Sequence, residues 1–294
     1  MIVYLATAAH DYPMGDFLAG PGAALAGRVR TMHYEEVLTR DPDRLPLGTW
    51  IFADLERLGW QGAMLAARLW RRLAERGCRL LNHPTRALRR YEMLRLLHDK
   101  GINDFDVYRL TDQRPPRRYP VFLRRDDNHS GPVSALCGDA EALFTAVAGL
   151  RRRAWPRQRM IVVEFSDTRG ADGLYRKFGA FHVAGSVVAG HMDTSRAWAV
   201  KDIDIVDPAE TAAELRFLDE NPWADAIIDV FRLARLDYGR IDFSVRDGRM
   251  IVWEINTNPL IASPASLRPD RAAVAARVFP RLAAALAALD GPSG

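Results

Sequence analysis

Cysteine is scarce in this chain of 294 residues, which contains only Cys78 and Cys137. The two thiols are far apart and lack the close spacing of metal-binding cysteines, which argues against a disulfide framework or a zinc site. The start of the chain has no basic flank before its apolar residues, and these are followed at once by His10 and Asp11. A signal peptide and a membrane span are therefore not indicated, and we expect a cytoplasmic protein without a membrane partner.

Lysine is also rare, because it occurs only at positions 100, 177 and 201, while arginine is abundant. The net charge of +4 and the isoelectric point near 9.3 are compatible with nucleic-acid binding. However, the arginines are dispersed over several expected elements, and no known nucleic-acid-binding motif accompanies them. We expect no nucleic-acid partner, and arginines that face solvent or phosphate groups instead.

The chain is 48% hydrophobic and long enough for two or three lobes with a substantial core. Its first 85 residues alternate expected strands (2–6, 50–53, 79–81) with a helix at 64–76, as in an α/β lobe. Asp54 and Asn82 lie at the ends of expected strands, where a substrate contact and a purely structural role are equally good interpretations. His10, Asp11 and Tyr12 have the same two interpretations.

The most informative segment is a predicted hairpin at residues 238–256, whose strands are joined by Asp247-Gly248. Asp242 and Glu254 fall on its neighbouring strands, within apolar sequence where a lone carboxylate would be costly. With the side-chain oxygen of Asn256 they form an oxygen-donor set that suits Mg²⁺ held between protein and phosphate groups. A structural pair of acids on a hairpin is the alternative interpretation.

Two motifs in this hairpin, Gly239-Arg240-Ile241-Asp242 and Glu254-Ile-Asn256-Thr-Asn-Pro259, resemble the metal motifs of the ATP-grasp superfamily. The D-alanine–D-alanine ligase and RimK-like branches are the most similar. The resemblance implies an ATP-grasp fold of the α/β class, with α+β lobes, preceded by an N-terminal α/β lobe. It also implies ATP with Mg²⁺, or alternatively Mn²⁺, bound by Asp242, Glu254 and Asn256, and a catalytic Arg240 that steadies the reacting oxygens. Leu260 stands where those ligases have a glycine.

The same resemblance suggests three lobes, at residues 1–85, 86–165 and 166–294, and further nucleotide contacts. Arg124 occupies the position of a phosphate-binding lysine, and the loop that follows it has His129 and little glycine. Arg89 or Arg90 holds the approximate place of another phosphate-binding lysine. Gly179 replaces an arginine of the family. The other implied cofactor-binding residues are Glu164, at the adenine and ribose, and Arg176, Lys177 and Lys201, at the phosphates.

The remaining pattern predicts helices at residues 85–100, 140–152, 211–218 and 223–236, and strands at 119–123, 160–165, 180–183 and 186–190. A final Ala- and Leu-rich helix at 271–289 is expected to be interrupted by Pro280. Its apolar side is explained by core packing or by a homodimer face.

The resemblance to ATP-grasp proteins implies a ligase that activates a carboxylate with Mg-ATP as an acyl phosphate and transfers the acyl group to an amine. Its substrates would be small-molecule or peptide carboxylates and amines. Two alternatives stay open: a nucleotide-binding regulatory or scaffold protein without ligase activity, and an ATP-dependent kinase of a small molecule.

Overall fold

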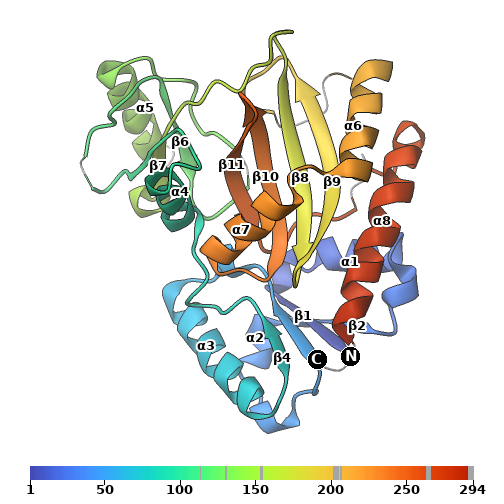
Figure 1. Ribbon diagram of the computed structural model, residues 1–294. Helices are drawn as coiled ribbons and strands as arrows, with labels where there is room; N and C mark the ends of the chain where they lie inside the picture. Colours follow the sequence, from blue (N-terminus) through green and yellow to red (C-terminus); the bar gives the residue numbers. More distant parts are fainter. Residues whose placement is uncertain are drawn as a thin grey trace.

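Three β-sheets make up the framework of the described part of the protein (Figure 1). The structure is a computed structural model that describes residues 1–112, 114–129, 131–152, 155–200, 205, 207–262 and 266–290. The first sheet is parallel and is formed by the N-terminal part of the chain. The other two are antiparallel. The chain thus has the α/β class that its sequence predicts.

The N-terminal sheet has the strand order β2-β1-β3-β4, with bounds β1 Ile2–Ala6, β2 Val29–His33, β3 Thr49–Phe52 and β4 Arg79–Leu81. β1 and β3 are buried along their whole length, as expected of parallel strands covered on both faces. Helices α1 (Tyr12–Ala19), α2 (Tyr34–Val37) and α3 (Trp60–Glu75) belong to this part of the chain. α3 ends where Gly77 adopts a φ of 77°, which a glycine does without strain.

The smallest sheet has the order β5-β7-β6, formed by β5 Val107–Arg109, β7 Met160–Glu164 and β6 Val121–Arg125. Helix α5 (Ala140–Arg152) lies beside it in Figure 1, and α4 (Arg90–Asp99) precedes it in the chain. α4 begins five residues later than predicted, because residues 84–89 form turns and extended chain instead. Strand β5 was not predicted, since three residues are too few to show a period.

The third sheet has the order β11-β10-β8-β9. Its strands are β8 Tyr175–Val183, β9 Ser186–Ser195, β10 Tyr238–Arg246 and β11 Arg249–Asn256, and its helices are α6 (Pro208–Glu220), α7 (Ala224–Ala234) and α8 (Ala272–Ala287). The predicted hairpin is β10–β11. Its turn residues Asp247 and Gly248 both have positive φ, at 49° and 69°, which matches the right-handed twist of the strands. The pairing register places Asp242 opposite Glu254.

The predicted interruption of the last helix is wrong, because Pro280 lies inside α8. Packing holds the helix together on both sides of the proline: Val278 and Leu282 are buried, and α8 contacts β9 and α6 (Figure 1). By length and composition the stretch Pro269–Asp290 could also cross a membrane, with 33% of its apolar window buried. A helix packed on a protein core has the same composition.

Asn82, directly after β4, joins the N-terminal sheet to β10. Its side chain is fully buried; the amide nitrogen donates to the carbonyl oxygens of Phe52 (3.3 Å) and Tyr238 (2.9 Å). The side-chain oxygen accepts from the backbone N–H groups of Asp237 (2.8 Å) and Tyr238 (3.0 Å). Of the two interpretations of Asn82, these contacts support the structural one. The side chain fixes the start of the strand that carries Asp242.

Asn82→Ala is expected to lower the free energy of unfolding by roughly 2–4 kcal/mol, because it leaves buried backbone groups without partners. Chemical denaturation at constant m-value would measure the loss. Thr85→Ala is the control, since Thr85 is exposed in the same connection; an equal, small effect of both changes would contradict this role of Asn82.

Candidate functional site

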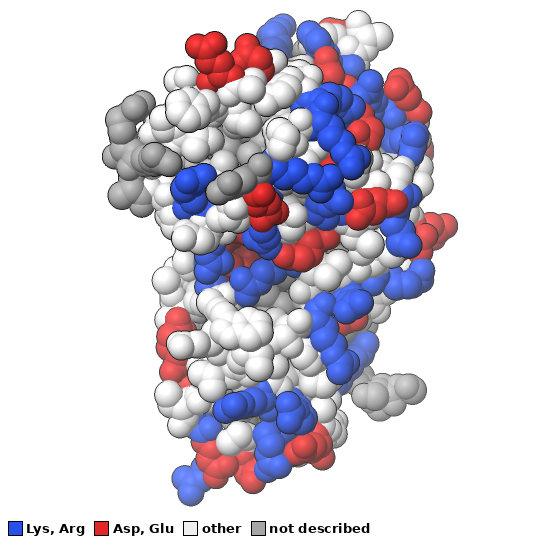
Figure 2. Space-filling model, turned by 90° about the vertical axis from the view of Figure 1, so that its left-hand side faces the viewer, with Lys and Arg blue, Asp and Glu red and all other residues white. Residues whose placement is uncertain are grey.

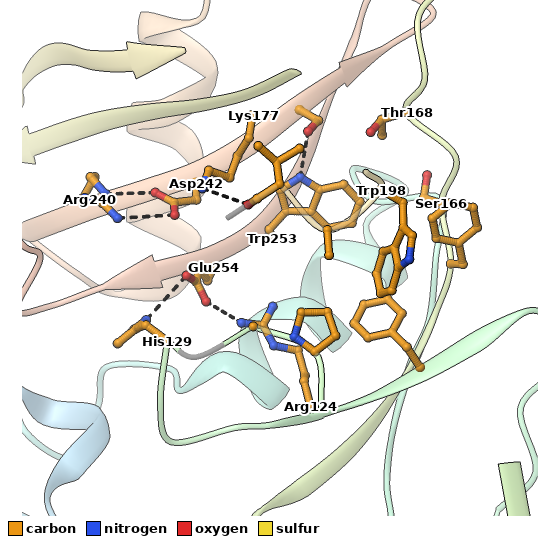
Figure 3. Close-up of a pocket in the computed structure, with 17 residues that line it drawn as sticks. Arg124, His129, Ser166, Thr168, Lys177, Trp198, Arg240, Asp242, Trp253 and Glu254 are labelled. Carbon is orange, nitrogen blue, oxygen red and sulfur yellow. Dashed lines mark hydrogen bonds and ion pairs between the residues drawn. The ribbon is translucent and has the colours of Figure 1, made fainter. Parts of the chain in front are cut away.

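A cavity of about 440 Å³ opens between the small sheet and the C-terminal sheet (Figure 3). Charged side chains occupy one side of it, and aromatic and hydroxyl side chains occupy the other. The residues used below that line this cavity are Phe122, Arg124, His129, Phe165, Ser166, Thr168, Lys177, Trp198, Arg240, Asp242 and Glu254.

Strand alternation explains why the predicted acids reach this cavity. Asp242 lies between Ile241 and Phe243, which are fully buried on the other face of β10. The pairing register then brings Glu254 of β11 beside Asp242. The register shifts directly after Asp242, and such an irregularity re-aims side chains locally. Both side chains are largely buried, with 7% of Asp242 and 11% of Glu254 exposed.

Glu254 is the most heavily compensated charge of the site. Its Oε2 accepts from Arg124 at 2.6 Å and also from Arg90, while Nδ1 of His129 lies 3.5 Å from Oε1. Burial opposes the charged form, yet Arg90, Arg124 and His129 outweigh it and hold the pKa of Glu254 well below its usual range. Burial and the charge of Arg90 lower the pKa of Arg124 to about 10, so Arg124 remains a cation at neutral pH.

His129 connects this cluster to the N-terminal part of the chain. Its Nε2 lies 2.9 Å from Oε1 of Glu56, whose carboxylate also accepts from the hydroxyl and the backbone N–H of Thr257. Burial disfavours charge on both partners. Nevertheless, the two glutamates raise the pKa of His129, and the contacts with His129 and Thr257 lower the pKa of Glu56 to about 2. His129 is therefore not an exposed loop residue, since its side chain is only 18% exposed and contacts two glutamates.

Arg240, the predicted catalytic residue, lines the cavity and pairs with Asp242. Its Nε donates to Oδ1 of Asp242 at 2.9 Å, and its Nη1 donates to the carbonyl oxygen of Leu260 at 3.1 Å. The Leu260 residue is 40% exposed. Leu260, which the family resemblance places at a glycine of the ligases, is thus tied to Arg240 through its backbone carbonyl.

Lys177 also reaches the cavity, where its Nζ lies 3.2 Å from Oδ2 of Asp193 and donates to the carbonyl of Val200 at 3.1 Å. His191 lies 3.6 Å from the same carboxylate oxygen. A Cβ atom at Gly179 would be 2.2 Å from Cε1 of His191, so the imidazole fills the space beside this glycine. The sequence indicated neither His191 nor Asp193 as partners of Lys177.

Three predicted contacts are not among the residues that line the cavity. Arg176 pairs with Asp172 and Glu210, because alternation along β8 directs it away from Lys177. Glu164 is buried; it accepts from the Tyr108 hydroxyl at 2.7 Å and from three backbone N–H groups, of Asp106, Arg117 and Arg118. Asn256 accepts from the backbone N–H of Asn258 at 2.8 Å. Lys201 lies outside the described residues.

The aromatic side of the cavity was not predicted. The Trp198 ring lies 4.9 Å from Phe122 and 5.7 Å from Phe165, measured between ring centroids. Ser166 follows Phe165, and its buried hydroxyl has no hydrogen-bond partner among the described residues. The sequence feature that could have predicted this side of the cavity is the polar run Ser166–Thr168, which follows the buried strand β7 and Phe165. An apolar wall with an unpartnered hydroxyl suits a flat, polar-edged ring.

The donor set also fits a hard divalent cation. In the described part of the chain, no three His, Cys, Asp or Glu side chains converge as a metal cluster. The predicted set combines two carboxylates with an amide, and both acids line the cavity. Asp242 and Glu254 offer the oxygen ligands that Mg²⁺ prefers, with further ligands expected from a bound phosphate group.

Comparison with solved structures identifies the fold. A D-alanine–D-alanine ligase from Bacillus anthracis, crystallised with ATP, has a TM-score of 0.58 at 14% identity, over 99% of this chain and 97% of that one. The VanG D-Ala:D-Ser ligase of Enterococcus faecalis has 0.55 at 11% identity, over 99% of each chain. A RimK domain ATP-grasp protein of Sphaerobacter thermophilus has 0.52 at 17% identity, over 95% and 99%. No family model and no curated protein matches the sequence. The chain has the ATP-grasp fold.

The ion pair between Glu56 and His129 predicts a pH dependence. The folded-state pKa of Glu56 is depressed, so its stabilising contribution is present above pH 4.5 and lost as pH falls towards 2. Up to about 3 kcal/mol is expected to disappear over this range. The stability difference between wild type and Glu56→Gln should therefore shrink between pH 5 and pH 2. A difference that stays constant with pH would contradict the assignment.

Proposed function

We propose that the protein is an ADP-forming ligase that joins a carboxylate to an amine. The observation that supports this most is the cavity in which Asp242 and Glu254 face Lys177, Arg124 and Arg240. The two acids suit a metal ion held between the protein and phosphate oxygens. The three basic side chains would compensate the phosphate charge that the metal leaves. The fold shared with ATP-grasp ligases supports the same reaction class.

The roles of the residues follow from their places. Asp242 and Glu254 would hold Mg²⁺; Asn256, the third predicted ligand, follows Glu254 on β11 but does not line the cavity, and its oxygen already accepts from Asn258. Lys177 and Arg124 would bind phosphate oxygens, one as a compact charge and the other through a planar fork. Trp198 and Phe122, with the hydroxyl of Ser166, would receive the base. Arg240 would steady the reacting oxygens.

The proposed chemistry has two steps. A substrate carboxylate oxygen attacks the γ-phosphorus, the bond to the β-phosphate oxygen breaks, and ADP leaves. The amine then attacks the acyl carbon, inorganic phosphate leaves, and the amine loses a proton. Bound Mg-ATP supplies the phosphoryl group, whereas the chain positions the reactants and compensates charge.

A second candidate is nucleotide binding without ligation. The observation that favours it is the compensation of Glu254 by Arg90, Arg124 and His129, since a carboxylate balanced in this way does not require a metal for its charge. This protein would bind ATP as a regulator or scaffold. The ligase differs from it by releasing ADP only when an acid and an amine are both present.

Glu254→Gln is expected to lower ADP release by at least about a hundredfold, because it removes charge at the metal while it keeps the shape of the side chain. The assay supplies ATP, Mg²⁺ and a panel of amino acids and short peptides as acids and amines. Release that requires both substrates supports the ligase. Release with the acid alone at the full rate would support a kinase instead.

Asp247→Asn is the matched control, since Asp247 is an exposed turn residue of the same hairpin, with its side chain 86% exposed. Its activity should equal that of wild type. Because Glu254→Gln leaves Arg90 and Arg124 without a full counter-charge, its folding must be checked by circular dichroism and thermal unfolding. Full activity in a folded Glu254→Gln variant would contradict the proposal.

A further inference from the structure

A second groove, of about 540 Å³, lies outside the proposed nucleotide cavity. Among the described residues, the two have no lining residue in common. The groove is formed by the start of α3, the connection before α4, and residues near the ends of the small sheet and of α7. We call it the arginine groove. Figure 2 shows the side of the molecule on which α3, α4 and α5 lie, with basic side chains around a hollow in its middle.

Arginine dominates the lining, with Arg86, Arg89, Arg109, Arg159 and Arg235 against two acids, Glu92 and Asp126. Arg109 pairs with both acids, and Nε of Arg159 lies 3.7 Å from Asp127. Arg86 and Arg235 are exposed and have no side-chain partner among the described residues. The groove therefore keeps positive charge beyond its internal ion pairs, which favours an anionic partner.

The two acids add a second requirement. Asp126 is only 9% exposed, and its Oδ1 has no hydrogen-bond partner in the described part of the chain. Oε2 of Glu92 is buried and likewise without a partner there. Both oxygens are enclosed by the protein and closed to a partner, so the negative groups of an occupant must reach the arginines while they avoid these two carboxylates.

Trp60 completes the groove. It is the first residue of α3, lines the groove, and is 75% exposed. A large indole presented to solvent beside basic side chains can cover an apolar side chain of a partner while its neighbours bind charge.

We propose that the arginine groove is a docking site for an acidic peptide segment. Aspartate or glutamate side chains would pair with Arg86, Arg89 and Arg235, spaced so that they avoid Asp126 and Glu92. A nucleic acid fits less well, because two carboxylates within the groove oppose its closely spaced phosphates. The proposal rests on this groove and not on the proposed ligase reaction.

The test measures binding by fluorescence anisotropy with the whole protein and a labelled peptide of about ten residues, rich in glutamate and containing one leucine. The double variant Arg86→Gln with Arg235→Gln is expected to weaken binding roughly tenfold or more. Trp60→Ala should also weaken it. Arg30→Gln with Arg44→Gln is the control; both arginines are exposed and outside the groove, and this variant should bind like wild type.

Two competing ligands complete the experiment: the same peptide with glutamine in place of glutamate, and an oligothymidylate of equal charge. The proposal expects the acidic peptide to bind more tightly than both, and less tightly as salt increases. It is overturned if wild type does not bind the peptide, if the groove variant binds it unchanged, if the neutral peptide binds equally, or if the oligonucleotide binds more tightly.

Discussion

The ionic cluster around Glu254 is the constraint on which the rest of the site depends. A buried carboxylate is costly unless several groups compensate it, and here the compensation comes from three separate places: Arg90 at the start of α4, Arg124 on β6 and His129 in the following loop. His129 in turn reaches Glu56, in the N-terminal part of the chain. One charge on β11 thus fixes the positions of segments that are distant in sequence.

This arrangement bears directly on the proposed function. Because Arg124 is already oriented at Glu254 and lines the cavity with Asp242 and Lys177, it would meet a ligand there without an ordering cost at the moment of binding. A metal ion bound to Glu254 would neutralise part of its negative charge. Part of the positive charge of the arginines would then be available for an anionic ligand. The cluster therefore orders these side chains without a ligand, and it would present Arg124 to the phosphate groups of the proposed nucleotide.

The hairpin could be predicted because all its signals are local: the alternation along β10, the Asp247-Gly248 turn and the β-branched run of β11. Arg124, Lys177 and Arg240 could be placed through the family resemblance, and all three line the cavity. The contacts of Glu254 with Arg90 and His129 could not be predicted in this way. These residues are 164 and 125 positions away from Glu254 in the sequence, and a local pattern contains no information about such a contact.

Glu164 and Arg176 show a different difficulty. Each has a residue type suited to a nucleotide, but the sequence does not reveal that Tyr108 and three backbone N–H groups bind Glu164, or that Asp172 and Glu210 bind Arg176. Similarly, proline is disfavoured inside a helix, which the sequence shows. The packing of α8 on β9 and α6, which keeps the helix intact at Pro280, is not visible in the sequence. Local propensity predicts the elements, whereas the choice among polar partners depends on the tertiary structure.

The most direct test of the central claim is a calorimetric titration of the protein with a non-hydrolysable ATP analogue, with and without Mg²⁺. We expect saturable binding of one nucleotide per chain that is at least about tenfold tighter with Mg²⁺, and loss of this difference in Asp242→Asn. Binding that is equally tight without Mg²⁺, or no binding by the folded wild type, would contradict it.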